Sequence, residues 1–277
     1  MLIRAYAKIN WNLNVLGELP GGYHELDMLM QSVELCDDVE LLEGDQLSLD
    51  IAGAQGLSAG EDNLMLRAAR LLREHTGIER GVRMRLLKRI PMQAGMGGGS
   101  SDAAAVLRGL NEMWGAALGE DELCALGLKL GADVPYCLTG GLCRARGLGE
   151  RLRREQGAPE VRLIVAMPER GLSTAGVFRR CKSGCVQDAA RALEALRAHD
   201  WAWLDAHTMN DLQAPACELR PEIAKCIALM RECGADFARM TGSGSAVYGV
   251  FETASAERAL ERVRAAYPVC WLTRTIK

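Results

Sequence analysis

Residues 95–101 form a glycine- and serine-rich stretch that leads directly into a predicted helix. Four of these seven positions are glycine and two are serine, so the backbone there is almost bare of side chains. Apolar residues then recur at helical spacing, at Ala103, Val106, Leu107, Leu110 and Met113. This spacing predicts a helix that begins near Ser100. Because a helix start has unpaired N–H groups and partial positive charge, the stretch predicts a phosphate-binding loop.

Two common nucleotide-binding patterns do not fit this loop. It does not end in Gly-Lys-Ser/Thr and carries no cation, so it is not the common P-loop. Nor is it a Rossmann fingerprint, which needs a strand before its glycines and an acidic residue some way after them. The alternative is a flexible turn with a serine N-cap, which a run of glycines this dense disfavours.

The bulk properties exclude several classes of partner. A length of 277 residues allows one large domain or two of ordinary size, and a net charge of −3 gives no basic field for a nucleic acid. We expect no signal peptide and no membrane segment, because polar residues interrupt the apolar runs. Ten cysteines without an export signal indicate reduced thiols in a cytoplasmic protein. The pair Cys181 and Cys185 has no second pair to complete a zinc site.

Residues 2–16 alternate in the manner of a β-strand. Its apolar side is formed by Ile9, Trp11, Leu13 and Val15, and its polar side by Lys8, Asn10, Asn12 and Asn14. The polar side has two interpretations at this point: a wall that faces a ligand, or an ordinary solvated face.

Downstream of this strand, Tyr23 and His24 follow two glycines, as a ring-binding pair or as a structural loop. Short strands are predicted at 33–35, 39–42, 47–51 and 82–86, and Asn63 is predicted to cap a helix that runs to about residue 75. After a helix at 121–129, Pro135 is expected to end regular structure, which leaves Asp133 in a constrained turn, as a cap or a catalyst.

The charged stretch 150–160 is the best domain boundary. Beyond a strand at 161–166, helices are predicted at 173–179 and 186–199. The remaining order is helix 221–233, strand 236–240, Gly-rich turn 242–245, strand 246–251, helix 254–267 and strand 269–275. Helices interleaved with hairpin strands favour an α+β sandwich of the ferredoxin-like sort.

Three segments in fixed order, 8–10, 95–101 and 242–245, resemble the three motifs of the GHMP kinase superfamily. Within it, the segments 7–10, 21–26, 95–105 and 130–135 are similar to the branch that phosphorylates 4-diphosphocytidyl-2-C-methyl-D-erythritol. The resemblance implies a two-domain α+β fold: an N-terminal ATP-binding domain (ribosomal protein S5 domain 2-like) at 1–155 and a C-terminal substrate domain at 156–277. It also implies a cytoplasmic enzyme of the non-mevalonate isoprenoid pathway that is a monomer or weak homodimer.

The resemblance further implies a role for each motif residue. Asp133 matches the catalytic base and Lys8 the catalytic cation, with ATP and Mg²⁺ as donor and cofactor and with the metal ligands unassigned. The ATP-binding loop is implied at Pro91, Met92, Gln93, Ala94, Gly95, Met96, Gly97, Gly98, Gly99, Ser100 and Ser101. The implied contacts to the cytidyl-diphospho-methylerythritol substrate are Asn10, Tyr23, His24, Phe178, Gly242 and Ser243.

Three residues depart from the family pattern. Gln93 and Met96 stand where smaller or branched residues are expected, and Arg146 stands where an acidic residue is expected. Two other readings stay open. A homoserine or phosphomevalonate kinase would keep the glycine loop but has no reason to carry Gly-Tyr-His. A non-catalytic sensor of the same fold would be free to lose Lys8 and Asp133.

Overall fold

The computed structural model describes residues 1–54, 56–168, 171–181 and 187–277. They form two compact units, the first made of residues 1–7, 35–90 and 97–140 and the second of residues 8–34, 91–96 and 141–277. Two long strands, β1 (Leu2–Leu19) and β2 (Tyr23–Gly44), contribute to both units. The boundary predicted at 155/156 lies inside the second unit, and it stays a prediction about the functional domains.

The first unit is a sheet covered by helices. β3 (Leu47–Ala52) pairs in parallel with β4 (Gly81–Leu87), and α1 (Leu64–Thr76) connects the two strands. β4 is antiparallel to the second half of β2. The other helices are α2 (Gly98–Met113), α3 (Glu120–Leu128) and α4 (Val134–Thr139), and α2 packs against α1, α3 and α4.

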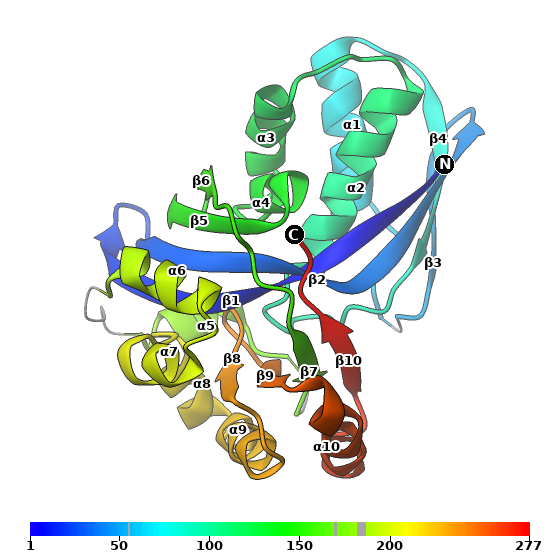
Figure 1. Cartoon of the computed structure of the whole chain (residues 1–277). Coiled ribbons are helices and arrows are strands. Elements are labelled where there is room, and N and C mark those ends of the chain that lie inside the picture. The colour runs from blue at the N-terminus through cyan, green and yellow to red at the C-terminus, as the bar shows by residue number, and fades with distance from the viewer. Residues whose placement is uncertain (55, 169–170, 182–186) are drawn as a thin grey trace. The chain divides into compact units, whose positions relative to one another are not determined.

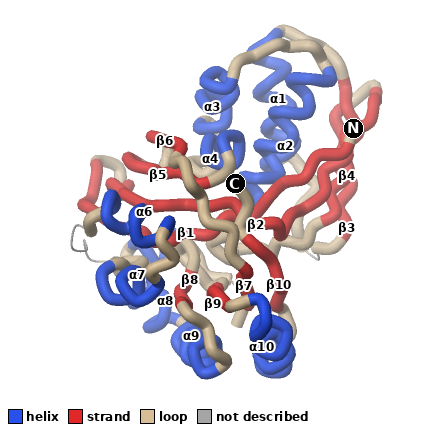
Figure 2. The backbone as a smooth tube through the Cα atoms, in the orientation of Figure 1, coloured by secondary structure: helices blue, strands red, loops and turns tan. Residues whose placement is uncertain are grey.

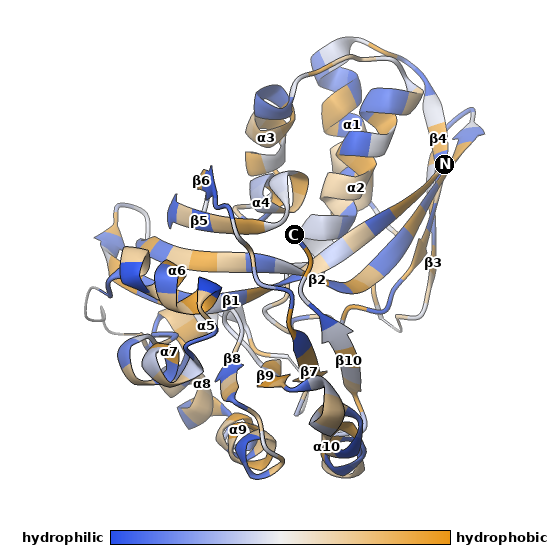
Figure 3. Ribbon diagram, viewed as in Figure 1, coloured by the Kyte–Doolittle hydropathy of each residue, from blue (hydrophilic) through white to orange (hydrophobic). Residues whose placement is uncertain are grey.

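Helix α1 forms where the sequence predicts it. Asn63 caps its first turn, with Oδ1 accepting the N–H of Met65 at 2.9 Å. Hydrophobic and hydrophilic residues both occur along the helix (Figure 3), and the buried ones are Met65, Leu66, Ala68, Ala69 and Leu72. These residues recur at helical spacing, so burial of one face holds the helix against its neighbours.

The prediction of separate short strands at 33–35 and 39–42 is wrong, because β2 runs unbroken from Tyr23 to Gly44. Asp37 suggested a turn, but its carboxylate is buried and accepts the backbone N–H groups of Arg89 and Ile90. A tertiary partner therefore satisfies the acidic residue and leaves the strand intact. Pro135 likewise does not end regular structure: it lies in the first turn of α4, where a missing N–H costs nothing.

The second unit contains the remaining strands of this six-stranded sheet and a separate four-stranded sheet. The first half of β2 pairs with β5 (Leu142–Gly147), which pairs with β6 (Arg151–Arg154) inside the stretch predicted as a domain boundary. The other sheet is antiparallel and has the order β10-β7-β9-β8, formed by β7 (Arg162–Ala166), β8 (Phe237–Met240), β9 (Val247–Phe251) and β10 (Cys270–Arg274). Figure 2 shows these strands beside two helices, α9 (Glu222–Glu232) and α10 (Thr253–Ala266).

Helices α9 and α10 pack on this sheet and against each other, which confirms the ferredoxin-like prediction for the C-terminal part of the chain. α5 (Thr174–Phe178) and α6 (Ala189–Arg197) also match predicted helices, although Cys185 and Val186 lie outside the described residues. Besides α4, two helices were missed, α7 (Trp201–His207) and α8 (Gln213–Leu219). Among the helices of the described residues, none has the length and apolar composition needed to cross a membrane.

Candidate functional site

The glycine loop enters α2 earlier than predicted. The helix begins at Gly98 rather than near Ser100, and its N-cap is Gly97, which has φ 71°. No side chain caps this helix start, so the interpretation of a turn with a serine N-cap is wrong. The first N–H groups of the helix thus lie open to an anion on a glycine backbone.

The two serines of the loop differ in what their surroundings allow. Ser101 is buried and its hydroxyl donates to the carbonyl oxygen of Tyr6 at 2.7 Å, so it fastens α2 to β1 within the first unit. Ser100 is only partly buried. Of the two hydroxyls, that of Ser100 is the freer to contact a ligand.

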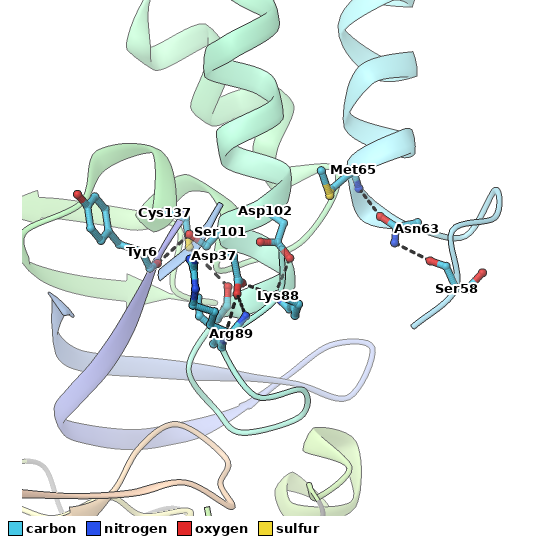
Figure 4. Close-up of polar contacts among 12 residues, drawn as sticks. Tyr6, Asp37, Ser58, Asn63, Met65, Lys88, Arg89, Ser101, Asp102 and Cys137 are labelled. Atoms are coloured by element: carbon cyan, nitrogen blue, oxygen red, sulfur yellow. Dashed lines mark hydrogen bonds and ion pairs between the residues drawn. The ribbon is translucent and has the colours of Figure 1, made fainter. Parts of the chain in front are cut away.

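A buried ionic cluster lies beneath the start of α2 (Figure 4), and sequence reasoning missed it. Lys88 Nζ donates to Asp37 Oδ2 at 2.5 Å and to Asp102 Oδ2 at 2.6 Å. The three side chains are at most 5% exposed, and Lys88 Nζ lies 3.0 Å from the point that a Cβ on Gly98 would occupy. The cluster therefore fixes the backbone of the first helical turn.

One lysine between two carboxylates leaves an excess negative charge in a dry place. Asp102 Oδ1 is buried and has no hydrogen-bond partner in the residues that the structure describes. The pKa of Asp102 is raised to about 7, chiefly by burial and also by the neighbouring Asp37, while Lys88 acts to lower it. The desolvated carboxyl thus holds a proton more readily than an exposed one does.

Asp102→Asn is expected to make the free energy of unfolding less dependent on pH. A carboxyl with a raised pKa stabilises the fold while protonated, and this contribution is lost as the pH rises from 3.8 to about 7. Chemical denaturation should show that the free energy of unfolding of the variant, relative to that of the wild type, is higher at pH 8 than at pH 5. Asp50→Asn, in an exposed pair with Arg83, is the control. Equal differences at both pH values would contradict the prediction.

Asp133 lies at the N-cap position of α4 in the first unit, with φ −81° and ψ −13°. Its side chain makes no capping hydrogen bond. Asp133 is only partly buried, so its carboxylate is accessible from outside the first unit's core. Asp133 therefore occupies the cap position that one of the two interpretations gives it, but its side chain does not bond to the helix start.

Lys8 and Asn10 lie on β1 in the second unit and are tied to each other. Lys8 Nζ donates to Asn10 Oδ1 at 2.7 Å, and that oxygen also accepts the N–H of Gly242 at 3.0 Å. Lys8 is 4% exposed and Asn10 is fully buried, so the alternative of a solvated strand face is excluded. The structure brings Lys8, Asn10 and the turn at Gly242 together, whereas Asp133 belongs to the other unit.

The glycine loop and the Gly-rich turn of the second unit touch through their backbones. A Cβ on Gly95 would collide with the carbonyl oxygen of Thr241, and one on Gly242 would lie 2.5 Å from the oxygen of Gly95. The N–H of Ala246 donates to Ala94 at 3.1 Å. Glycine at both positions is what allows two stretches so distant in sequence to pack this closely.

Two further residues, Asn210 and Thr174, contact the turn through hydrogen bonds. Asn210 Nδ2 donates to the oxygens of Met240 and Gly242 at 3.0 and 2.8 Å, and Ser243 Oγ lies 2.9 Å from Thr174 Oγ1. Asn210 was missed by sequence reasoning, because nothing near it in the chain signals a contact made 30 residues later.

The predicted base-binding residues are partly assembled. The rings of His24 and Phe178 lie 5.0 Å apart with their planes tilted by 34°, whereas Tyr23 is 61% exposed. Within the second unit, therefore, two of the three rings are in contact and the third is free to cover a ligand.

The departures from the family pattern have separate structural settings. Gln93 adopts φ 54° in the loop and is exposed, while Met96 is buried. Arg146 is exposed on β5, and the neighbouring Arg144 forms a salt bridge to Asp27, with Nε to Oδ1 at 2.8 Å. That carboxylate raises the pKa of the Arg144 guanidinium.

Two family models match the chain. The GHMP kinases N terminal domain matches residues 63–141, and the GHMP kinases C terminal domain matches residues 192–269. These two stretches include the whole glycine loop with α2, Asp133, and the turn at Gly242. The predicted boundary at 155/156 lies between them.

Relatives and solved structures agree with these matches. The 4-diphosphocytidyl-2-C-methyl-D-erythritol kinase of Pelotomaculum thermopropionicum is 42% identical over 98% of this chain and 96% of its own length. A crystal structure of 4-(cytidine 5'-diphospho)-2C-methyl-D-erythritol kinase superposes with a TM-score of 0.86 at 37% identity, covering 100% of both chains. The Methanococcus jannaschii mevalonate kinase shares the fold alone, with a TM-score of 0.72 at 15% identity over 100% of this chain and 98% of that chain.

This degree of identity extends over nearly the whole chain and includes both halves of the fold. The protein belongs to the 4-diphosphocytidyl-2-C-methyl-D-erythritol kinase family, within the GHMP kinases.

Proposed function

We propose that the protein transfers the γ-phosphoryl group of ATP to the 2-hydroxyl of 4-diphosphocytidyl-2-C-methyl-D-erythritol, giving the 2-phosphate and ADP. The observation that carries the proposal is the 42% identity, over 98% of the chain, to a kinase named for this substrate. The reaction belongs to the non-mevalonate route to isoprenoid precursors.

Asp133 is proposed as the base and Lys8 as the cation of this reaction. Phosphoryl transfer needs an aligned hydroxyl, an acceptor for its proton and compensation of charge on the phosphoryl oxygens. The carboxylate of Asp133, which makes no capping hydrogen bond, takes the proton as the new P–O bond forms and the bond to ADP breaks. The ammonium of Lys8, held by Asn10, stabilises the negative charge.

The loop 91–101 is proposed to hold the phosphates of ATP. The uncapped N–H groups at the start of α2 support this role, because they present several donors on a glycine backbone. Lys88 lies beneath the loop and is paired to Asp37 and Asp102. It therefore supports the loop and is not proposed to contact the phosphates as the lysine of the common P-loop does.

Mg²⁺ is proposed to enter as part of the Mg·ATP substrate. Among the described residues, no group of three or more His, Cys, Asp or Glu side chains is arranged to hold a metal. This fits Mg²⁺, which commonly binds substrate phosphates and keeps several waters. When bound, the ion neutralises the developing charge on the phosphates.

The cytidine ring is proposed to bind at Tyr23, His24 and Phe178. The contact between His24 and Phe178 supports the assignment of these two, and Asn10 with the turn at Gly242 and Ser243 is assigned to the polyol. We further propose a cytoplasmic protein that is a monomer or weak homodimer.

Tyr23→Ala is expected to raise the Michaelis constant for the cytidyl substrate. Loss of stacking on a base costs on the order of 1–3 kcal/mol, which is about 5- to 150-fold in affinity. Because Tyr23 is 61% exposed, its removal should leave the folded state intact. Steady-state kinetics with Tyr23→Phe as the matched control checks this, and an unchanged Michaelis constant in the alanine variant would remove Tyr23 from the base-binding site.

Coupled measurement of ADP release tests the proposed function itself. The purified protein receives ATP, Mg²⁺ and one of four additions: the cytidyl substrate, homoserine, phosphomevalonate or no acceptor. Turnover with the cytidyl substrate alone is expected. Turnover with another acceptor would keep the phosphoryl-transfer chemistry and discard the cytidine assignment, and ATP binding without any turnover would favour a sensor.

A further inference from the structure

The polar face of β1 continues beyond the two residues assigned to the reaction. Asn12 and Asn14 occupy the next two alternate positions after Lys8 and Asn10, so all four side chains lie on one face of the strand. The opposite face is apolar, where the ring of Trp11 lies 5.8 Å from that of Trp201. Asn12 and Asn14 are each 1% exposed, as deeply buried as Lys8 and Asn10.

The four side chains differ in how their hydrogen-bonding groups are satisfied. Lys8 and Asn10 bond to each other, and Asn10 Nδ2 also donates to Met28 Sδ at 3.3 Å. Asn12 Oδ1 accepts the N–H of Leu29 at 2.9 Å, but within the described part of the chain Asn12 Nδ2 has no partner. Neither amide atom of Asn14 has a hydrogen-bond partner among the described residues.

These unsatisfied groups are costly to the fold. Buried amides are normally paired, and each unpaired group loses its hydration without compensation. Asparagine is also a poor strand former, so neither propensity nor internal bonding accounts for Asn12 and Asn14 in the middle of a strand. Groups retained at such a cost point to a partner outside the chain.

The order of these four polar side chains along β1 indicates which chemical groups the partner presents to them. Successive members are two residues apart, about 6.6 Å. Asn14 is the member nearest the hairpin turn, and Tyr23 and His24 begin the next strand. The proposed substrate has the same order: polyol, diphosphate, ribose, cytosine.

We propose that Asn12 and Asn14 bind the middle of the substrate, Asn12 through its diphosphate and Asn14 through its ribose. This inference rests on the proposed function. The free group of Asn12 is a donor, which suits phosphate oxygens that only accept. Asn14 has a free donor and a free acceptor, which suits a hydroxyl that does both.

Isothermal titration calorimetry with CDP, cytidine and 2',3'-dideoxycytidine tests the two assignments without turnover. Asn12→Leu should weaken CDP binding by about tenfold or more, as for a charged partner, and leave cytidine binding unchanged. Asn14→Leu should weaken CDP and cytidine binding by about three- to tenfold and leave dideoxycytidine binding unchanged.

A matched control separates binding from folding. Asn111 bonds both its amide groups to Leu118, at 2.9 and 3.1 Å, in the first unit. Asn111→Leu should lower the midpoint of thermal unfolding and keep CDP affinity, whereas Asn14→Leu should keep or raise that midpoint and lose affinity. Asn12→Ser and Asn14→Ser take the place of the leucine variants if those do not fold.

The outcomes distinguish this inference from the function on which it rests. A folded wild-type protein that binds neither CDP nor cytidine would overturn the proposed function. A wild type that binds both, with variants that bind them equally well, would overturn the roles of Asn12 and Asn14 alone. An equal loss for CDP, cytidine and dideoxycytidine in either variant would also overturn them, because it indicates a distorted strand.

Discussion

Asp133→Asn is expected to lower kcat by about 10²- to 10⁴-fold, with both Michaelis constants within about twofold of the wild type. The amide has nearly the shape of the carboxylate but cannot accept the proton of the attacking hydroxyl. Because the Asp133 side chain caps nothing, the substitution breaks no hydrogen bond of α4. The chemical step should therefore be lost while the fold and substrate binding survive.

Steady-state kinetics of the Asn variant check this expectation, together with its thermal unfolding. Asp121→Asn, an exposed acidic residue in the first turn of α3, is the matched control and should retain full turnover. Turnover of Asp133→Asn close to that of the control would show that another group accepts the proton.

Lys88→Met is expected to lower the free energy of unfolding by about 3–5 kcal/mol, which is the largest effect on stability that the structure predicts. The variant leaves the buried carboxyl groups of Asp37 and Asp102, both at most 4% exposed, without their cation. Neither can regain solvent without opening the start of α2, so the loss of one partner is costly.

Chemical denaturation of Lys88→Met measures this loss. Arg83→Met, whose pair with Asp50 is exposed, should change the free energy of unfolding by less than about 1 kcal/mol. Adding Asp102→Asn to Lys88→Met should recover part of the stability, because one uncompensated charge is removed. A loss in Lys88→Met no larger than that of the arginine control would show that the cluster is not a structural ion pair.

The sequence predicts the elements that hydrophobic periodicity defines. The helix capped by Asn63 and the ferredoxin-like order of the C-terminal part both appear in the structure, because local caps and alternation determine them. β2 was divided in error, since the partners of Asp37 lie about 50 residues away. β6, α7 and α8 are short and carry weak periodicity, so tertiary packing decides them.

The candidate site was predictable where a motif carries the chemistry. The glycine run, Lys8 and Asp133 stand out as residue types at characteristic positions. Lys88 and Asn210 could not be found in this way, because a lone lysine at a strand end and a lone asparagine in a loop have many ordinary roles. Their importance comes from partners 51, 14 and 32 residues away, which only the folded chain brings together.

The contact between Gly95 and Gly242 limits how this protein can be altered, in evolution or by design. Two positions almost 150 residues apart share a space that holds backbone only, so a side chain gained at either must be accommodated by a shift of the other. Variation in the loop is thereby confined to side chains outside this contact, such as the exposed Met92. Redesign of the loop for a different phosphoryl donor therefore requires that the residues of the loop and of the Gly-rich turn be chosen together.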